Sequence, residues 1–161
     1  MHETSYLEMS SNVGLYLKDL PPESIVVDVG SLDVNGSYKA LIDPPFRYVG
    51  VDLSPGPNVD QVMVSEFDSG LPADHAAAVI SGQCLEHCTN PFLLVKEMFR
   101  ICKPGGFILL TAPWAWPIHR YPLDCWRFLP DGIRILIESA GGIFVESYLN
   151  DQDCWGIGRA Q

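Results

Sequence analysis

The chain has 161 residues, which is enough for one compact domain and leaves little room for a second. Its 20 acidic and 10 basic residues give a formal net charge of -10, which repels phosphate backbones and anionic membranes. A hydrophobic share of 47% supports a packed core and argues against disorder. We therefore expect a single domain over residues 1–161 that binds neither nucleic acid nor membrane.

The cysteines and the first residues indicate the compartment. The five cysteines are odd in number and scattered, which favours reduced thiols over a disulfide framework. Met1-His2-Glu3 begins a polar, acidic segment rather than a signal peptide, and the longest apolar runs are only strand-sized. These features predict a cytoplasmic protein.

Apolar periodicity and turn residues divide the chain into short, alternating strands and helices. Residues 1–12 are expected to form a loosely attached arm, and Pro21-Pro22 would stop a short helix over 13–20. The strongest helical pattern covers 90–102, where Asn90 is a good N-cap and Pro91 suits the first helical position. The expected strands cover 24–29, 48–52, 61–64, 76–81, 107–111, 143–149 and 153–158, and further helices cover 36–41 and 131–140.

This order of elements predicts an α/β fold. Strands that alternate with helices indicate a mostly parallel sheet covered by helices on both faces. The two final strands follow each other closely, so we expect a hairpin and one antiparallel edge strand. The connection between 48–52 and 61–64 is too short for a full helix, which makes this a sheet with trimmed helices.

The turn after the first strand is where a ligand is expected, because ligands in open α/β sheets sit at the carboxyl ends of strands. The turn reads Asp28-Val29-Gly30-Ser31-Leu32-Asp33-Val34-Asn35-Gly36-Ser37, without the G-x-G-x-x-G spacing of dinucleotide sites. A carboxylate at Asp28 suits a ligand with an ammonium group. Asp52 ends the second strand, where an acidic side chain can accept both hydroxyls of a ribose. Each feature alone also fits an ordinary turn or strand-end cap.

Four segments together resemble the successive motifs of class I S-adenosylmethionine-dependent methyltransferases: VVDVGSLDVNGSY, YVGVDLS, VISGQCLEH and MFRICKPGGFILLTAP. The resemblance runs from about residue 24 to residue 158, and it implies the Rossmann-like sheet of that family and S-adenosylmethionine as cofactor. GSLDVNGSY with HRYPLDCWRFLPDG further resembles a bacterial subgroup of methyltransferase-domain proteins that has no settled substrate.

The resemblance also implies which residues bind the cofactor. The first motif would hold the methionine part, although Ser31–Asn35 replaces its middle glycines and leaves the path of this loop open. The second strand would hold ribose and adenine, the turn after the third strand the adenine edge (to within a residue or two), and the end of the fourth strand the methyl group. The implied residues are Asp28, Gly30, Ser31, Gly36, Asp52, Leu53, Phe67, Asp68, Ser81, Gly82, Gln83 and His87.

Residues 114–128, after the fifth strand, are the expected acceptor side because they hold three of the four tryptophans at a strand's carboxyl end. His119 is the leading candidate for a general base, and Tyr121 and Arg127 could orient or neutralise an acceptor. The alternative is a structural lid, in which Trp126 and Phe128 pack on the core and Asp124 pairs with Arg127.

No metal site is expected. Cys84, His87 and Cys88 are suitable ligand types, but Cys125 and His119 are distant in sequence, so no second close pair completes a site. The expected function is methyl transfer from S-adenosylmethionine to a small-molecule or sugar-like acceptor, with a second copy of the chain as a conceivable partner. A cofactor-binding module without catalysis stays open as an alternative, and a nicotinamide-dependent oxidoreductase is disfavoured by the missing glycine fingerprint.

Overall fold

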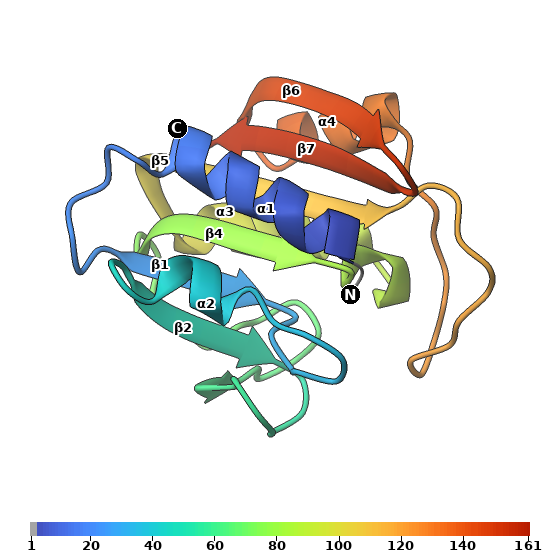
Figure 1. Ribbon diagram of the computed structural model, residues 1–161, viewed down its shortest axis with the longest axis horizontal. Helices are drawn as coiled ribbons and strands as arrows, with labels where there is room; N and C mark the ends of the chain where they lie inside the picture. Colours follow the sequence, from blue (N-terminus) through green and yellow to red (C-terminus); the bar gives the residue numbers. More distant parts are fainter. Residues whose placement is uncertain (1–2) are drawn as a thin grey trace.

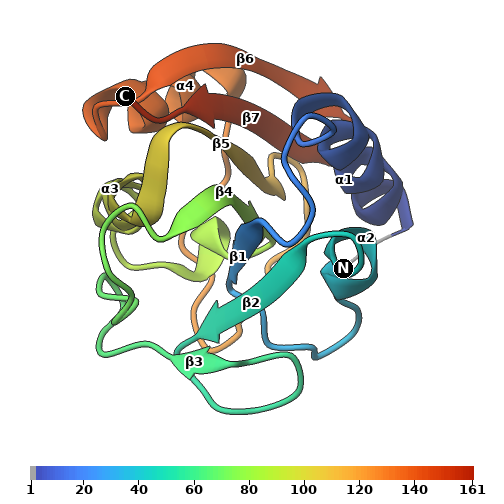
Figure 2. The ribbon, with the colours of Figure 1, turned by 90° about the vertical axis from the view of Figure 1, so that its left-hand side faces the viewer.

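Seven strands form one sheet in the computed structural model of the chain, which describes residues 3–161. The strands are β1 (Ile25–Val29), β2 (Arg47–Asp52), β3 (Gln61–Val62), β4 (Ala76–Gly82), β5 (Cys102–Pro113), β6 (Ile143–Asn150) and β7 (Asp153–Arg159). Their order across the sheet is β3-β2-β1-β4-β5-β7-β6, and the first five pair in parallel (Figures 1 and 2). The expected mostly parallel sheet with antiparallel pairing at one edge is confirmed.

The antiparallel pairing comes from β7, which inserts between β5 and β6 and runs opposite to both. The strands β6 and β7 form the expected hairpin, and β6 is the outer strand. The connection from β2 to β3 contains no helix in the described chain, as its length predicted.

Helices cover both faces of the sheet, as Figure 2 shows. The helices are α1 (Glu3–Tyr16), α2 (Lys39–Ile42), α3 (Pro91–Ile101) and α4 (Pro130–Ser139), with a 3-10 turn η1 (Leu85–His87). One core lies between the sheet and α3 and α4, around Met98 and Ile108, and the other lies under α1 and α2, around Ile80 and Trp155. Because β1 and β4 are covered on both faces, their sequences are nearly continuous apolar runs. None of the helices in residues 3–161 is both long and apolar enough to cross a bilayer.

The expectation of a loosely attached arm over 1–12 is wrong for residues 3–12, which belong to α1; residues 1–2 lie outside the described chain. Met9 and Val13 are four positions apart, so they share one helix face, and both are buried in the second core. Polar contacts add to this packing. A hydrogen bond of 2.8 Å joins the Ser5 and Tyr38 hydroxyls, and the Asn12 amide donates to the Tyr148 hydroxyl at 2.8 Å.

The segment from α3 to β5 brings the chain to the carboxyl ends of the parallel strands. Asn90 caps α3 by accepting a hydrogen bond from the Leu93 amide at 3.4 Å, and Pro91 is the first helical residue, as expected. The strand β5 begins at Cys102, directly after the helix and earlier than predicted. It ends at Pro113, where the long connection to α4 projects beyond the strand ends (Figure 1).

Candidate active site

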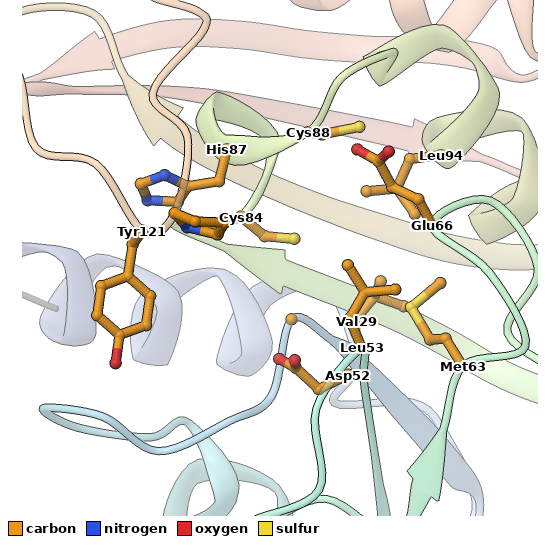
Figure 3. Close-up of a pocket in the computed structure, with 12 residues that line it drawn as sticks. Val29, Asp52, Leu53, Met63, Glu66, Cys84, His87, Cys88, Leu94 and Tyr121 are labelled. Atoms are coloured by element: carbon orange, nitrogen blue, oxygen red, sulfur yellow. The ribbon is translucent and has the colours of Figure 1, made fainter.

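A cleft opens at the carboxyl ends of β1 and β2, next to η1. It has a volume of about 100 Å³ and is partly open to solvent. Figure 3 shows Asp52 between His87 and Tyr121 on one side and Met63 and Glu66 on the other. The lining residues are Val29, Gly30, Asp52, Leu53, Met63, Glu66, Cys84, His87, Cys88, Leu94, Tyr121 and Pro122.

Gly30 forms the floor of this cleft, and its position requires a glycine. Its φ is +85°, and a Cβ there would lie 2.6 Å from the Cβ and 2.7 Å from the sulfur of Cys84. The Gly30 and Ser31 amides both donate to the Val51 carbonyl, at 2.8 and 3.2 Å, so the chain turns tightly toward β2. The missing side chain at Gly30 therefore lets Cys84 pack against the backbone at the end of β1.

Asp52 determines the path of the loop that replaces the family's glycine run. Its Oδ2 accepts a hydrogen bond from the Leu32 amide at 3.0 Å, and its Oδ1 accepts one from the Ser54 amide at 3.2 Å. The Asp33 amide then donates to the Pro57 carbonyl at 3.1 Å, so the loop lies along the connection that follows β2. Each carboxylate oxygen of Asp52 keeps a further lone pair, which leaves it able to accept ligand hydroxyls.

Three residues expected to bind the cofactor hold strand ends together instead of lining the cleft. Asp28 is 3% exposed and accepts a hydrogen bond from the Tyr48 hydroxyl at 2.9 Å; burial raises the pKa of Asp28 to about 7. The Ser81 hydroxyl donates to the carbonyl that ends β1, at 2.7 Å. Gln83 donates from its side chain to Asp153 at 2.9 Å.

Five further expected residues also lie outside the lining. Ser31 is buried, and its hydroxyl has no hydrogen-bond partner in the described chain. Gly36, with φ of +134°, is bonded through its amide to an aspartate of its own loop, and Gly82 lies against the ring of a tyrosine. Phe67 packs on the core, and Asp68 caps an exposed turn. Gly30, Asp52, Leu53 and His87 are the expected cofactor residues that the cleft brings together.

Glu66 is a lining residue that the sequence reasoning missed by one position. Its carboxylate accepts hydrogen bonds from the Thr89 amide and from the Thr89 hydroxyl, the latter at 2.6 Å. Burial alone would raise the pKa of Glu66, but these hydrogen bonds outweigh it and lower that pKa. The cleft therefore has a charged carboxylate near the residues expected at the adenine edge.

The connection over 114–128, which we call the acceptor segment, is docked on η1. The Cys125 and Trp126 amides donate to the Glu86 carbonyl at 2.7 and 3.2 Å, and the Trp126 indole donates to the Cys88 carbonyl at 2.7 Å. This docking brings Tyr121, which is 58% exposed, to the cleft. It also stacks the His119 ring edge-to-face on His87, with centroids 4.9 Å apart.

Arg127 holds the acceptor segment in shape. Its guanidinium donates to both carboxylate oxygens of Asp124, at 2.6 and 2.8 Å, and to the Trp116 carbonyl. Asp124 also accepts the His119 amide at 2.7 Å, and the hydrogen bonds from Arg127 hold the pKa of Asp124 well below its usual range. The structural-lid alternative is supported by the Asp124–Arg127 ion pair and by the burial of Phe128, but it is wrong for Trp126, which is 42% exposed. Tyr121 lines the cleft.

The comparisons with known proteins give this arrangement a family. The family model described as methyltransferase domain matches residues 27–110, slightly more than half of the chain. The chain belongs to this family. The methyltransferase domain is 31% identical over 122 residues to an uncharacterised methyltransferase of Mycobacterium leprae, an overlap that covers 68% of this chain and 45% of the relative. It therefore spans less than half the length of that curated relative.

Solved structures share the fold of this methyltransferase domain. A methyltransferase in complex with a methyltransferase activator from Haloferax volcanii superposes with a TM-score of 0.74 at 15% identity, covering 98% of this chain and 90% of that one. A didemethyltoxoflavin methyltransferase of Burkholderia thailandensis, solved with S-adenosylhomocysteine, gives 0.73 at 14% identity, covering 99% and 80%. The Rossmann-like class I methyltransferase fold is thereby confirmed.

Proposed function

We propose that this methyltransferase domain transfers a methyl group from S-adenosylmethionine to a small-molecule or sugar-like acceptor. The observation that carries the proposal is the convergence of Gly30 and Asp52 on one cleft at the carboxyl ends of β1 and β2. An acidic side chain at the end of the second strand is suited to a ribose diol. Gly30 lines the cleft beside Cys84, which packs where a side chain at Gly30 would lie.

The other lining residues also fit S-adenosylmethionine. Leu53, Met63 and Leu94 offer apolar walls for an adenine ring, and Glu66 offers acceptor oxygens near its polar edge. When bound, the cofactor supplies a methyl group activated by a sulfonium charge. The net charge of -10 and the carboxylates of Asp52 and Glu66 favour such a cationic ligand.

The acceptor segment would supply the second half of the site. Tyr121 borders the cleft, and Trp114 and Trp116 are each more than a third exposed on the same segment. Aromatic rings with one polar end suit flat or sugar-like acceptors. Arg127 acts through Asp124, so we assign it as a positioning residue, whereas His119 and Tyr121 would contact the acceptor.

Calorimetric titration with S-adenosylhomocysteine tests the proposal. We expect one binding site, and Asp52→Ala should weaken it by about 10- to 100-fold, because hydrogen bonds to a charged group contribute about 1.5–3 kcal/mol. Glu138→Ala is the matched control, since it removes an exposed carboxylate on α4 far from the cleft. Absence of binding at millimolar ligand, or equal affinities for the two variants, would refute the cofactor assignment.

A further inference from the structure

The carboxylate of Glu86 lies buried in η1 without a hydrogen-bond partner in the described chain. Its side chain is 0% exposed, and neither oxygen accepts a hydrogen bond within residues 3–161. A buried carboxylate left without a donor or a positive charge costs several kcal/mol. A bound cation would therefore stabilise the Glu86 carboxylate, which lies next to the cofactor cleft. None of the roles assigned so far uses this carboxylate.

Two imidazoles face this carboxylate with the same ring nitrogen. Nε2 of His87 lies 3.6 Å from Glu86 Oε1, and Nε2 of His119 lies 3.9 Å from it. The Nδ1 atom of His87 bonds to the Leu123 carbonyl at 2.6 Å, and that of His119 lies 3.3 Å from the Pro117 carbonyl. When each Nδ1 carries the proton that these carbonyls accept, each Nε2 keeps a lone pair that can bind an ion next to Glu86.

We propose that Glu86, His87 and His119 form a binding site for a divalent transition-metal ion. Their three ligand atoms all lie within 4.8 Å of one another. Ligand atoms around one tetrahedral Zn²⁺, at about 2.1 Å from the ion, are about 3.4 Å apart, so a small inward movement suffices. Two histidines and one carboxylate are also a common ligand set for catalytic zinc and for non-haem iron.

The surroundings of the three residues are those of a metal site. Histidine ligands are usually oriented by a carbonyl or carboxylate on their other nitrogen, as both rings are here. Asp124 supports His119 in the same way, with its Oδ2 3.5 Å from Nδ1 and also bonded to the backbone amide. Asp153 and Asp124 add negative charge around Glu86, against the single nearby guanidinium of Arg127.

The sequence-based expectation of no metal site relied on the distance in sequence of Cys125 and His119 from Cys84, His87 and Cys88, and the proposed site differs from it. The acceptor segment removes that distance by folding back onto η1. The binding site itself stands on these side chains, whereas its part in the reaction rests on the proposed function. Because His87 also lines the cleft, the ion would bind an oxygen-bearing acceptor beside the cofactor and lower the pKa of its hydroxyl.

Titration of the whole chain with Zn²⁺ against a chromophoric chelator tests the proposal. We expect one ion per chain, with affinity reduced by about 100-fold or more in Glu86→Gln and in His119→Gln. His119 is 37% exposed on the acceptor segment, so its variant leaves the core intact if Glu86→Gln does not fold. His75→Gln is the matched control, because His75 precedes the amino end of β4, whereas Glu86 and His87 follow its carboxyl end.

No binding at micromolar Zn²⁺, or equal binding by His119→Gln and His75→Gln, would overturn the site; the second result would mean that zinc is held elsewhere, for example by the exposed Cys125. A parallel titration with S-adenosylhomocysteine separates the two proposals. Zinc binding without S-adenosylhomocysteine binding would refute the cofactor assignment alone. S-adenosylhomocysteine binding without zinc binding would refute the metal site alone.

Discussion

Replacement of Asp28 by asparagine measures the cost of a buried carboxylate at the end of β1. The pKa of this carboxyl is raised by burial from 3.8 to about 7, and the side chain is only 3% exposed. Asparagine keeps the shape and an oxygen that can accept the hydrogen bond from the Tyr48 hydroxyl, but it cannot ionise. The substitution therefore removes the charge with little change in packing.

The pH dependence follows from the direction of the shift. Folded protein keeps the Asp28 proton up to about pH 7, whereas unfolded chain releases it near 3.8, so this contribution to stability is complete below 3.8 and lost as the pH rises to about 7. One pKa unit corresponds to about 1.4 kcal/mol, which gives about 4 kcal/mol in total and about 3 kcal/mol between about pH 5 and pH 8. Asp28→Asn should escape this loss.

Urea denaturation of the wild-type chain and Asp28→Asn at these two pH values provides the assay. The free energy of unfolding of the variant, relative to wild type, should rise by about 3 kcal/mol from the lower to the higher pH. The comparison between two pH values cancels any constant effect of the asparagine amide. Glu138→Gln, on an exposed part of α4, should show no such change. A difference between Asp28→Asn and wild type that is the same at both pH values would refute the reasoning.

Two further substitutions test how the acceptor segment and α1 are held against the rest of the domain. Arg127→Ala should lower the free energy of unfolding by about 1.5–3 kcal/mol, because it leaves the carboxylate of Asp124 without its paired donors. Limited proteolysis should then cut the acceptor segment faster, and an unchanged rate would contradict its positioning role. Met9→Ala should cost about 2–5 kcal/mol in urea denaturation, because it empties a fully buried position. Leu7→Ala, at a side chain that is 60% exposed, should stay within about 0.5 kcal/mol, and equal effects would argue that α1 is not docked.

The sheet could be predicted because its signals are local. Buried parallel strands have uninterrupted apolar sequences. The strands β1 and β2 end next to Gly30 and at Asp52, and both of these residues line the cleft. The helix α1 could not be predicted this way. Its apolar Leu7 and Leu15 are exposed, while its polar Ser5 and Asn12 are buried against tyrosine hydroxyls. The buried face of α1 therefore depends on contacts with tyrosine hydroxyls as well as on its apolar Met9 and Val13.

The candidate site also contains residues that a local sequence pattern predicts and residues that only the folded chain brings together. Asp52 and Leu53 follow directly from their place at a strand end, so a sequence motif is sufficient to find them. The grouping of Glu86 with His119 depends on how the acceptor segment folds back. Backbone hydrogen bonds to the Glu86 carbonyl hold that segment, and any residue type can make such bonds. The spacing of residues in the sequence therefore could not predict that Glu86 and His119 lie close together.

The acceptor segment contributes little to the hydrophobic cores. Among the described residues from 114 to 128, Phe128 is the one buried hydrophobic side chain, whereas β4 and β5 are buried along most of their length. Substitutions in this segment, apart from those at Phe128 and in the Asp124–Arg127 pair, can therefore accumulate with little effect on the stability of the sheet. If the proposed function holds, a change of acceptor during evolution, or by grafting the segment of a relative, costs little stability as long as Phe128, the Asp124–Arg127 pair and the contacts to η1 are kept.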